Sequence, residues 1–346
     1  MADRTLTERQ LNRALLARQL LLERVQTPLP RALERVGGLQ TQYAPSGYLR
    51  LWTCVDGFER GRLTRALERR TVVQATLMRS TIHMVSAGDY WPLAEAVRED
   101  RRGSWLRAVG RTWNVAEVPA VAARVRAMLA EGPRPRNEIV EGLGIDPQTW
   151  NGVGLFVDMV RVPPSGTWER RRADLYGLAE DWLGPSTATA AEGIEHLVRR
   201  YLSAFGPASR KDVASFTGLA PARLDRALDR MTLRRFRDER GGELLDVPRA
   251  PLPDPETPAP VRLLPTWDAT LLVHARRTQI LPEHHRPRIF HTKNPQSVPT
   301  FLVDGRVAGR WTIQGDHVRV EPFERVTRSA LRELRDETER LEAFLA

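Results

Sequence analysis

The predicted secondary structure repeats along the chain, and this repetition limits the possible folds more than any other feature of the sequence. Helical segments followed by a short β element occur at residues 7–84, at 118–178 and at 192–247. The helical segments place apolar residues at helical spacing, whereas the β elements alternate or turn on glycine. Three helices closed by a two-stranded hairpin are typical of the winged helix, a variant of the helix-turn-helix. We therefore expect an α+β, mainly helical fold with three tandem winged-helix modules.

A local repeat supports tandem modules. Residues 63–71 and 224–232 are identical at six of nine positions, and each copy ends where a helix should meet its hairpin. Chance similarity between two arginine-rich amphipathic helices is the alternative explanation.

The composition changes after the third repeat. Six prolines in thirteen positions make residues 248–260 a stiff extended linker. Beyond it we expect strands at 261–264 and 270–273, a hairpin turning on Asp304-Gly305, and a final helix from about 327 to 345. The expected domains are an N-terminal winged-helix-like module (1–115), a second winged helix (116–185), a third (186–247), the linker (248–260) and a small β-rich C-terminal domain with a terminal helix (261–346).

Several elements can be predicted individually. Thr7 can cap an amphipathic helix over residues 7–25, and the third helix of the second module should span 147–159. Residues 79–85 should form a strand. Such a strand places Arg79, Thr81 and His83 on one face, where a charge, a hydroxyl and an imidazole could touch a phosphate or a substrate.

The charge balance indicates a polyanionic partner. Lys and Arg number 53 against 43 Asp and Glu, which gives a net charge of +10, and only Lys211 and Lys293 are lysines. A GC-rich genome would explain arginine over lysine but not the excess of base over acid. Arginine's planar fork suits phosphate, so nucleic acid is the expected partner.

The redox and targeting signals are those of a cytoplasmic protein. The single cysteine, Cys54, excludes an intrachain disulfide and a cysteine-rich zinc site. The N-terminus lacks an apolar signal core, and no apolar run approaches ~18 residues. We expect a cytoplasmic, nucleoid-associated bacterial protein with no membrane contact and no obligate protein partner.

Two glutamines stand two residues apart directly after a glycine pair. In extended backbone Gln40 and Gln42 would project to the same side, whereas on a helix they would lie ~200° apart. The spacing therefore has meaning only if the preceding helix stops at Gly37-Gly38. A solvated loop is the simpler reading of this motif taken alone.

Other chemistries find little support. His284, His285 and His291 invite a metal site, but adjacent histidines point apart on most backbones and no H-E-x-x-H pattern occurs. Neither a phosphate-binding P-loop nor a G-x-S-x-G nucleophile motif is present. We expect no metal and no cofactor.

Basic segments are spread over the predicted modules and could form one duplex-binding surface. Arg210 and Lys211 open a predicted helix, whose backbone N–H groups could bind phosphate with them. With the residues of the predicted strand, the candidate DNA contacts are Arg79, Thr81, His83, Arg170, Arg171, Arg172, Arg210, Lys211, Lys293 and Arg306.

Four motifs in order resemble those of the AlkZ-like DNA glycosylases, bacterial proteins built from tandem winged helices. They are Gly38-Leu39-Gln40-Thr41-Gln42, Arg79-Ser80-Thr81-Ile82-His83, Gly206-Pro207-Ala208-Ser209 and the segment 301–309. The resemblance runs over nearly the whole chain and implies a monofunctional DNA glycosylase. It would excise N7-alkylated purines from double-stranded DNA, and some members of the family also unhook interstrand cross-links. The family's catalytic glutamine pair maps onto Gln40 and Gln42, where other members have aspartate second.

The chemistry expected of such an enzyme suits neutral amides. A glutamine is not a general base near pH 7, but an N7-alkylated purine is cationic and leaves readily through an oxocarbenium-like state. Gln40 and Gln42 would then hold the attacking water. The alternative is a transcription regulator without catalysis, because winged helices are most often DNA readers and a fold does not fix a function.

Overall fold

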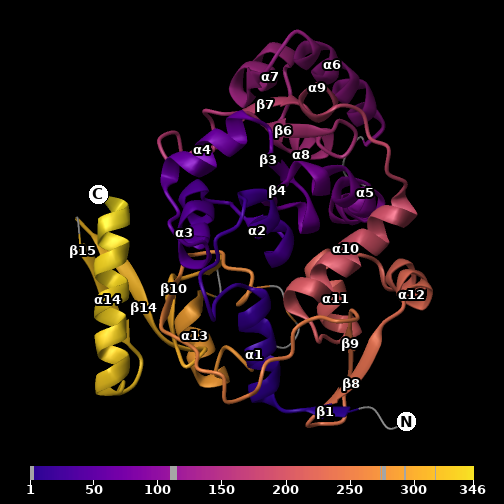
Figure 1. Cartoon of the computed structure of the whole chain (residues 1–346). Helices are drawn as coiled ribbons and strands as arrows, with labels where there is room; N and C mark the ends of the chain where they lie inside the picture. The colour runs from indigo at the N-terminus through magenta and orange to yellow at the C-terminus, as the bar shows by residue number, and fades with distance from the viewer. Residues whose placement is uncertain (1–3, 110–114, 273, 275–277, 292–293, 316) are drawn as a thin grey trace.

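The computed structural model describes residues 4–109, 115–272, 274, 278–291, 294–315 and 317–346. Within them the fold is mixed α+β, about half helical, with several sheets. Figure 1 shows residues 115–183 at one end of the molecule and the C-terminal sheet with helix α14 (Arg328–Leu345) at one side.

The N-terminal unit builds most of its core from short helices. Thr7 caps α1 with a reciprocal bond to Gln10, and Gly37 ends α2 in a left-handed conformation. Its elements are β1 (Arg4–Leu6), α1 (Glu8–Arg18), α2 (Leu29–Val36), β2 (Leu39–Gln40), α3 (Ala44–Cys54), α4 (Arg60–Glu68), β3 (Val72–Thr76), η1 (Met78–Ser80), β4 (Ile82–Ser86) and α5 (Ala87–Val109).

The second unit has its own apolar core but shares a sheet with the first. Strand β3 pairs with β6, so the two hairpins join in one six-stranded sheet of order β2-β4-β3-β6-β7-β5 instead of forming separate wings. Pairing satisfies backbone groups that two free hairpin edges would leave exposed. Its elements are η3 (Val115–Glu117), α6 (Val118–Ala130), β5 (Arg134–Pro135), α7 (Arg136–Leu143), α8 (Pro147–Val153), β6 (Met159–Arg161), β7 (Leu175–Leu178) and α9 (Ala179–Leu183).

The third unit is three helices and a hairpin, as the sequence predicts. Its hairpin gains a third strand, because the N-terminal β1 pairs in parallel with β8. The elements are α10 (Ala190–Phe205), α11 (Arg210–Thr217), α12 (Pro221–Arg230), β8 (Arg234–Asp238) and β9 (Glu243–Asp246).

The C-terminal segment contains a four-stranded sheet of order β10-β13-β14-β15 and a separate two-stranded sheet, β11-β12. The predicted turn at Asp304-Gly305 joins β13 to β14. The elements are β10 (Arg262–Leu264), η4 (Glu283–His285), α13 (Arg286–Ile289), β11 (Phe290–His291), β12 (Asn294–Ser297), β13 (Thr300–Val303), β14 (Arg306–Gln314), β15 (His317–Pro322) and α14 (Arg328–Leu345).

Three element predictions need correction. The first helix ends at Arg18 instead of 25, because Leu20 has a positive φ of 58° while the apolar side chains beyond the helix remain buried. Helix α8 stops at Val153, and Met159 already belongs to β6. Residues 270–272 form a turn, not a strand, because Asp268 accepts bonds from the backbone and hydroxyl of Thr270, while position 273 lies outside the described residues.

The longest helix, α5, has no counterpart among the sequence predictions. It packs against α10 and carries Pro92 inside, and its apolar residues do not gather on one helical face. A helix without an amphipathic stripe gives no periodic signal.

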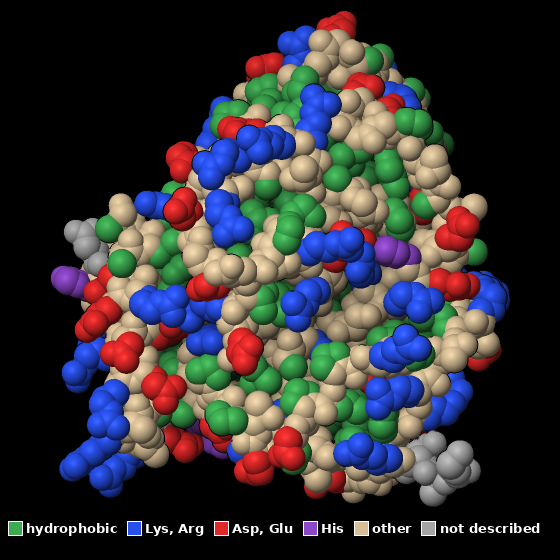
Figure 2. Space-filling view, viewed as in Figure 1, with side chains coloured by type: hydrophobic (Ala, Val, Ile, Leu, Met, Phe, Trp, Pro, Cys, Tyr) green, Lys and Arg blue, Asp and Glu red, His purple; other side chains and the backbone are tan. Residues whose placement is uncertain are grey.

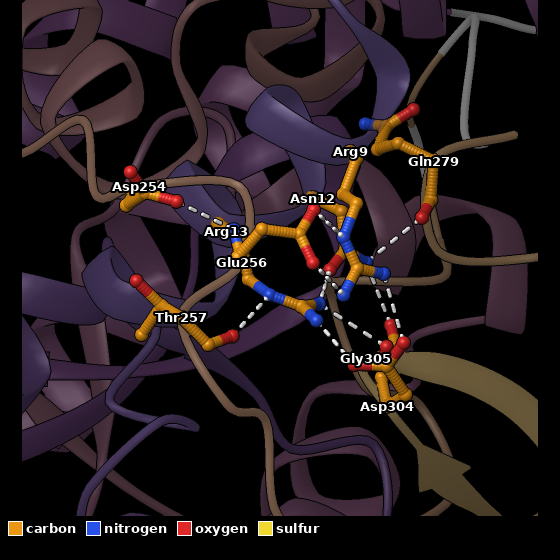
Figure 3. Close-up of polar contacts among 9 residues, drawn as sticks. All are labelled: Arg9, Asn12, Arg13, Asp254, Glu256, Thr257, Gln279, Asp304 and Gly305. Carbon is orange, nitrogen blue, oxygen red and sulfur yellow. Dashed lines mark hydrogen bonds and ion pairs between the residues drawn. The ribbon is translucent and has the colours of Figure 1, made fainter.

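Polar contacts hold α1 against segments that are distant in the sequence. Figure 3 shows Arg9, Asn12 and Arg13 of α1 directed toward the β13–β14 turn and the proline-rich linker. The side chain of Arg13, 1% exposed, pairs with Asp304 and donates to the carbonyl of Thr257 at 2.7 Å. The linker, which has no helix or strand, is thus held against α1.

Replacing Gly305 by alanine is expected to lower the free energy of unfolding by about 1–3 kcal/mol. Gly305 has φ +76°, and an added Cβ would lie 2.4 Å from Leu16 Cδ1 and 2.6 Å from Asn12 Oδ1. Gly315 is the matched control, because it has φ +61° with nothing within 4 Å. Urea unfolding should show the larger loss for Gly305→Ala, and equal losses would contradict the steric argument.

Candidate active site

The glycine pair places the two glutamines. Gly37 and Gly38 both have φ of 78°, and the N–H of Gly38 returns to the carbonyl of Leu33 at 2.9 Å. This ends α2 and sends the chain into β2, where Gln40 lies opposite His83 of β4. An added Cβ on Gly38 would lie 3.0 Å from Val85, so a side chain there would push β2 from its partner. The predicted helix stop at the glycine pair is confirmed.

Gln40 is buried and held by a cation. Its side chain is 8% exposed, and its Oε1 accepts a hydrogen bond of 3.1 Å from Nη2 of Arg79. A guanidinium bound to the amide oxygen fixes which end of the amide is oxygen and which is nitrogen.

Gln42 is exposed and held by the backbone. Its Oε1 accepts a hydrogen bond of 2.9 Å from the N–H of Ile82, and the N–H of Thr41 between the two glutamines donates to the Ile82 carbonyl at 2.8 Å. The segment from Arg79 to Ile82 therefore binds both amide oxygens. One glutamine is fixed in the interior and the other reaches solvent.

Arg79 does not lie in a strand, which corrects the prediction of a strand over 79–85. It sits in the tight turn η1 with φ 53°, and β4 begins at Ile82. Its Nη1 donates to the carbonyl of Phe216 at the end of α11, and its guanidinium lies 5.1 Å from the ring centroid of Phe216. Burial lowers the pKa of Arg79 to about 10, so it stays charged at neutral pH. Arg79 thus links the third unit to Gln40.

His83 faces the interior, and Thr81 is engaged within its own turn. The ring of His83 is 2% exposed, and its Nδ1–H donates to the Thr81 carbonyl at 3.0 Å. Burial, and then the charge of Arg79, lower the pKa of His83 to about 3. The Thr81 hydroxyl donates to Met78 at 3.1 Å. A neutral, buried imidazole is neither charged nor accessible to a phosphate, so this conformation argues against the predicted DNA contact at His83.

The burial of His83 should make the protein acid-sensitive. In the unfolded chain a histidine has a pKa near ~6.5, so between pH 6.5 and 5 the unfolded state binds more protons and stability falls by up to about 2 kcal/mol. The contribution of neutral His83 to folding stability is fully present above the pKa of a histidine in the unfolded chain. It is lost as the pH falls toward the folded-state pKa of His83, about 3. Urea unfolding at pH 7 and pH 5 should show a smaller acid loss for His83→Gln than for the wild type. Identical losses would contradict the shifted pKa.

Sequence reasoning missed a buried ion pair beside Gln40. Nε of Arg50 lies 2.9 Å from Oδ2 of Asp268, with side chains 4% and 1% exposed. Nη2 of Arg50 donates to both the carbonyl and Oε1 of Gln19, at 2.9 and 3.0 Å. The sequence did contain a signal for this pair. Arg50 stands within the otherwise apolar run of residues 48–52, and an arginine that is buried with such a run needs a partner of opposite charge.

The remaining predicted DNA contacts lie in three places. Arg171 is brought next to the glutamine motif, since its Nη1 donates to the hydroxyl of Tyr43 at 3.0 Å. Arg170 and Arg172 are exposed in the same loop. Arg210 pairs with Asp225 at 2.8 Å, whereas Lys211 is exposed at the start of α11. Exposed Arg306 donates to Thr278 at 3.2 Å, and Lys293 lies outside the described residues.

Two of the three histidines rejected above as a metal site do meet. The rings of His284 and His285 have centroids 4.0 Å apart, and their Nε2 atoms lie 3.0 and 3.5 Å from Oε1 of Glu324. The expectation that the adjacent rings point apart is wrong, because one carboxylate attracts both. These three residues could supply metal ligands. The side chain of His291 is not described.

The described part of the chain contains no helix long and apolar enough to span a bilayer.

Comparison with known proteins found similarity both in sequence and in fold. A family model described as DNA glycosylase AlkZ-like matches residues 33–344. The solved structure of Streptomyces sahachiroi DNA glycosylase AlkZ has a TM-score of 0.81 at 19% identity, over 98% of this chain and 97% of that chain. At this identity the likeness concerns the fold. No curated protein matches the sequence significantly.

Proposed function

The chain belongs to the AlkZ-like DNA glycosylase family, and from that premise we propose that it hydrolyses the N-glycosidic bond of N7-alkylated purines in double-stranded DNA. The arrangement of the glutamine pair carries the proposal. Gln40 is buried and bound by Arg79, and Gln42 is exposed and bound by β4. Two amides fixed by their neighbours, one of them open to solvent, suit the positioning of a water.

The reaction needs little acid–base help. An N7-alkylated purine is cationic, so the C1′–N9 bond can break with its electron pair moving to the purine, which leaves as a neutral base. Water then bonds to C1′ of the oxocarbenium-like sugar, and its proton passes to solvent. Gln40 and Gln42 would hold that water and turn amide oxygens toward the developing positive charge.

Basic side chains would hold the duplex. We interpret the three helix-and-hairpin units as winged helices, whose basic surfaces meet DNA phosphates. Figure 2 shows Lys and Arg side chains over the region of α10, α11 and β8–β9, and β8 contributes Arg234, Arg235 and Arg237. Arg171 and Lys211 are the phosphate contacts that we favour, because both side chains are exposed. Arg171 donates to Tyr43 next to the glutamine pair, and Lys211 lies on α11, the helix whose end binds Arg79.

A monofunctional reaction is expected. Cleavage of the DNA strand through a Schiff base needs a suitably placed lysine. Of the two lysines, Lys211 stands on α11 and Lys293 is not among the described residues. The product would be an abasic site. An open binding surface would also admit purines tied in an interstrand cross-link, which cannot be swung into a narrow pocket.

Release of N7-methylguanine from methylated duplex DNA tests the function. We expect free base and an intact strand bearing an abasic site, with no protein–DNA adduct trapped by borohydride. Undamaged duplex of the same sequence is the control. Binding to a defined undamaged sequence, without base release from any alkylated or cross-linked duplex, would favour a regulator instead.

A further inference from the structure

A small cavity lies directly behind Gln40. Its volume is about 10 Å³, and it is lined by Gln19, by residues of β2 and α3, and by residues 265–269. The polar side chains that matter at its wall are Gln40, Ser46, Arg50 and Asp268. A cavity of ~10–15 Å³ is about the size of one water molecule.

Three polar atoms at this cavity are buried without a hydrogen-bond partner among the described residues. They are Oγ of Ser46, Nη1 of Arg50 and Oδ2 of Asp268. These three residues are 2%, 3% and 4% exposed, respectively. Oδ2 lies 2.9 Å from Nε of Arg50, but that ion pair lacks the alignment of a hydrogen bond. Buried polar atoms are nearly always bonded to protein or to ordered water, so three at one cavity indicate a shared partner.

Gln40 supplies a fourth group. Its Oε1 is taken by Arg79, which leaves the Nε2 end of the amide as the donor. No hydrogen bond from Nε2 to an acceptor is found within the described part of the chain. Gln40, Ser46, Arg50 and Asp268 all line the cavity. The donors available from these side chains are Nε2 of Gln40 and Nη1 of Arg50, and the acceptors are Oγ of Ser46 and Oδ2 of Asp268.

We propose that one ordered water occupies this cavity and anchors the Gln40 amide from behind. A water accepts two hydrogen bonds and donates two, which matches the two donors and two acceptors at the wall. A bound ion is disfavoured, because Arg50 and Asp268 already neutralise each other. This structural water is distinct from the water that attacks the sugar.

The water gives Ser46, Arg50 and Asp268 a positioning role, and this consequence rests on the proposed function. Arg79 fixes Oε1 of Gln40 and the buried water fixes Nε2, so the amide cannot flip. Around metal ions, partners that orient the ligands from behind change metal affinity or activity by about 10–100-fold when they are removed, and we expect an effect of that order for the Gln40 amide.

Ser46→Val is the informative variant, since it removes the hydroxyl and fills the cavity with methyl groups. We expect a crystal structure of the full chain to show density for one water bonded to the four named atoms in the wild type. The water should be absent from Ser46→Val. The kcat for base release should fall about 10-fold in this variant, with KM for the duplex unchanged. Ser46→Thr keeps the hydroxyl and adds one methyl group to the cavity. If the valine variant does not fold, Ser46→Thr takes its place as the cavity-filling variant, with the same expected loss of the water and of kcat.

Thr300 is the matched control, because its Oγ1 is also buried and unpartnered within the described residues, yet Thr300 does not line this cavity. Thr300→Val should keep the wild-type kcat. A wild-type crystal structure without the water overturns the inference, whether or not the protein releases base. If the wild type shows density for the water but the cavity-filling variant keeps the wild-type kcat, the positioning role is overturned. A wild type that shows the water but releases no base overturns the proposed function and leaves the water site standing.

Discussion

Replacing Gln40 and Gln42 together by alanine is expected to reduce base release from alkylated duplex DNA by at least 10²–10³-fold, the loss seen when a preorganised polar group is removed from an active site. Affinity for the duplex should change little, because the proposed phosphate contacts lie elsewhere. Single-turnover release of N7-methylguanine and a binding titration on the same DNA separate the two effects.

The single variants should differ in character. Gln42 is exposed, so Gln42→Ala should lower kcat without loss of stability. Gln40 is 8% exposed and accepts a hydrogen bond from Arg79, so Gln40→Ala should lower both kcat and the free energy of unfolding. Gln40→Met keeps the volume and removes only the amide, which isolates the chemical loss.

Gln314, exposed at the end of β14, is the matched control for a lost glutamine side chain. Gln314→Ala should release base at the wild-type rate. If the double variant at Gln40 and Gln42 also releases base at that rate, the glutamine pair is not the active site. Loss of duplex binding in the double variant would instead assign the pair to DNA recognition.

Asp246→Ala should cost about 3–5 kcal/mol of folding free energy, the usual loss when one partner of a buried ion pair is removed. Asp246 and the side chain of Arg18 are 0% and 1% exposed, and Nη1 and Nη2 of Arg18 reach the two carboxylate oxygens at 2.7 and 3.0 Å. Among the described residues, the other hydrogen-bond acceptors of Arg18 are the carbonyls of Leu202 and Pro251. The variant would bury a charge without a counter-charge between α1 and the third unit.

Two comparisons make this prediction specific. Glu321→Ala breaks an ion pair with Arg310 whose side chains are 49% and 44% exposed, so its cost should stay below about 1 kcal/mol. The double variant Arg18→Met with Asp246→Leu replaces both charges by apolar groups and should recover much of the loss. Urea unfolding of the full chain measures all three, and equal losses for Asp246→Ala and Glu321→Ala would contradict the argument.

The sequence by itself determined the local features. The glycine pair that ends α2, the cap at Thr7 and the Asp304-Gly305 hairpin follow from short-range sterics and hydrogen bonding, and each is present. The AlkZ-like resemblance was also visible in the order of motifs, and the family match over residues 33–344 confirms it. Helix α5 escaped prediction because it is not amphipathic.

Only the tertiary structure decided how the site is assembled. Arg79 reads as a strand residue beside His83, yet a turn with positive φ carries it to Gln40 and to the end of α11. Arg50 and Asp268 are more than two hundred positions apart, and the residues around each do not predict which partner it will bind. Such pairs form where the folded core excludes water and each charge must find a partner, a requirement that appears only when distant segments pack together.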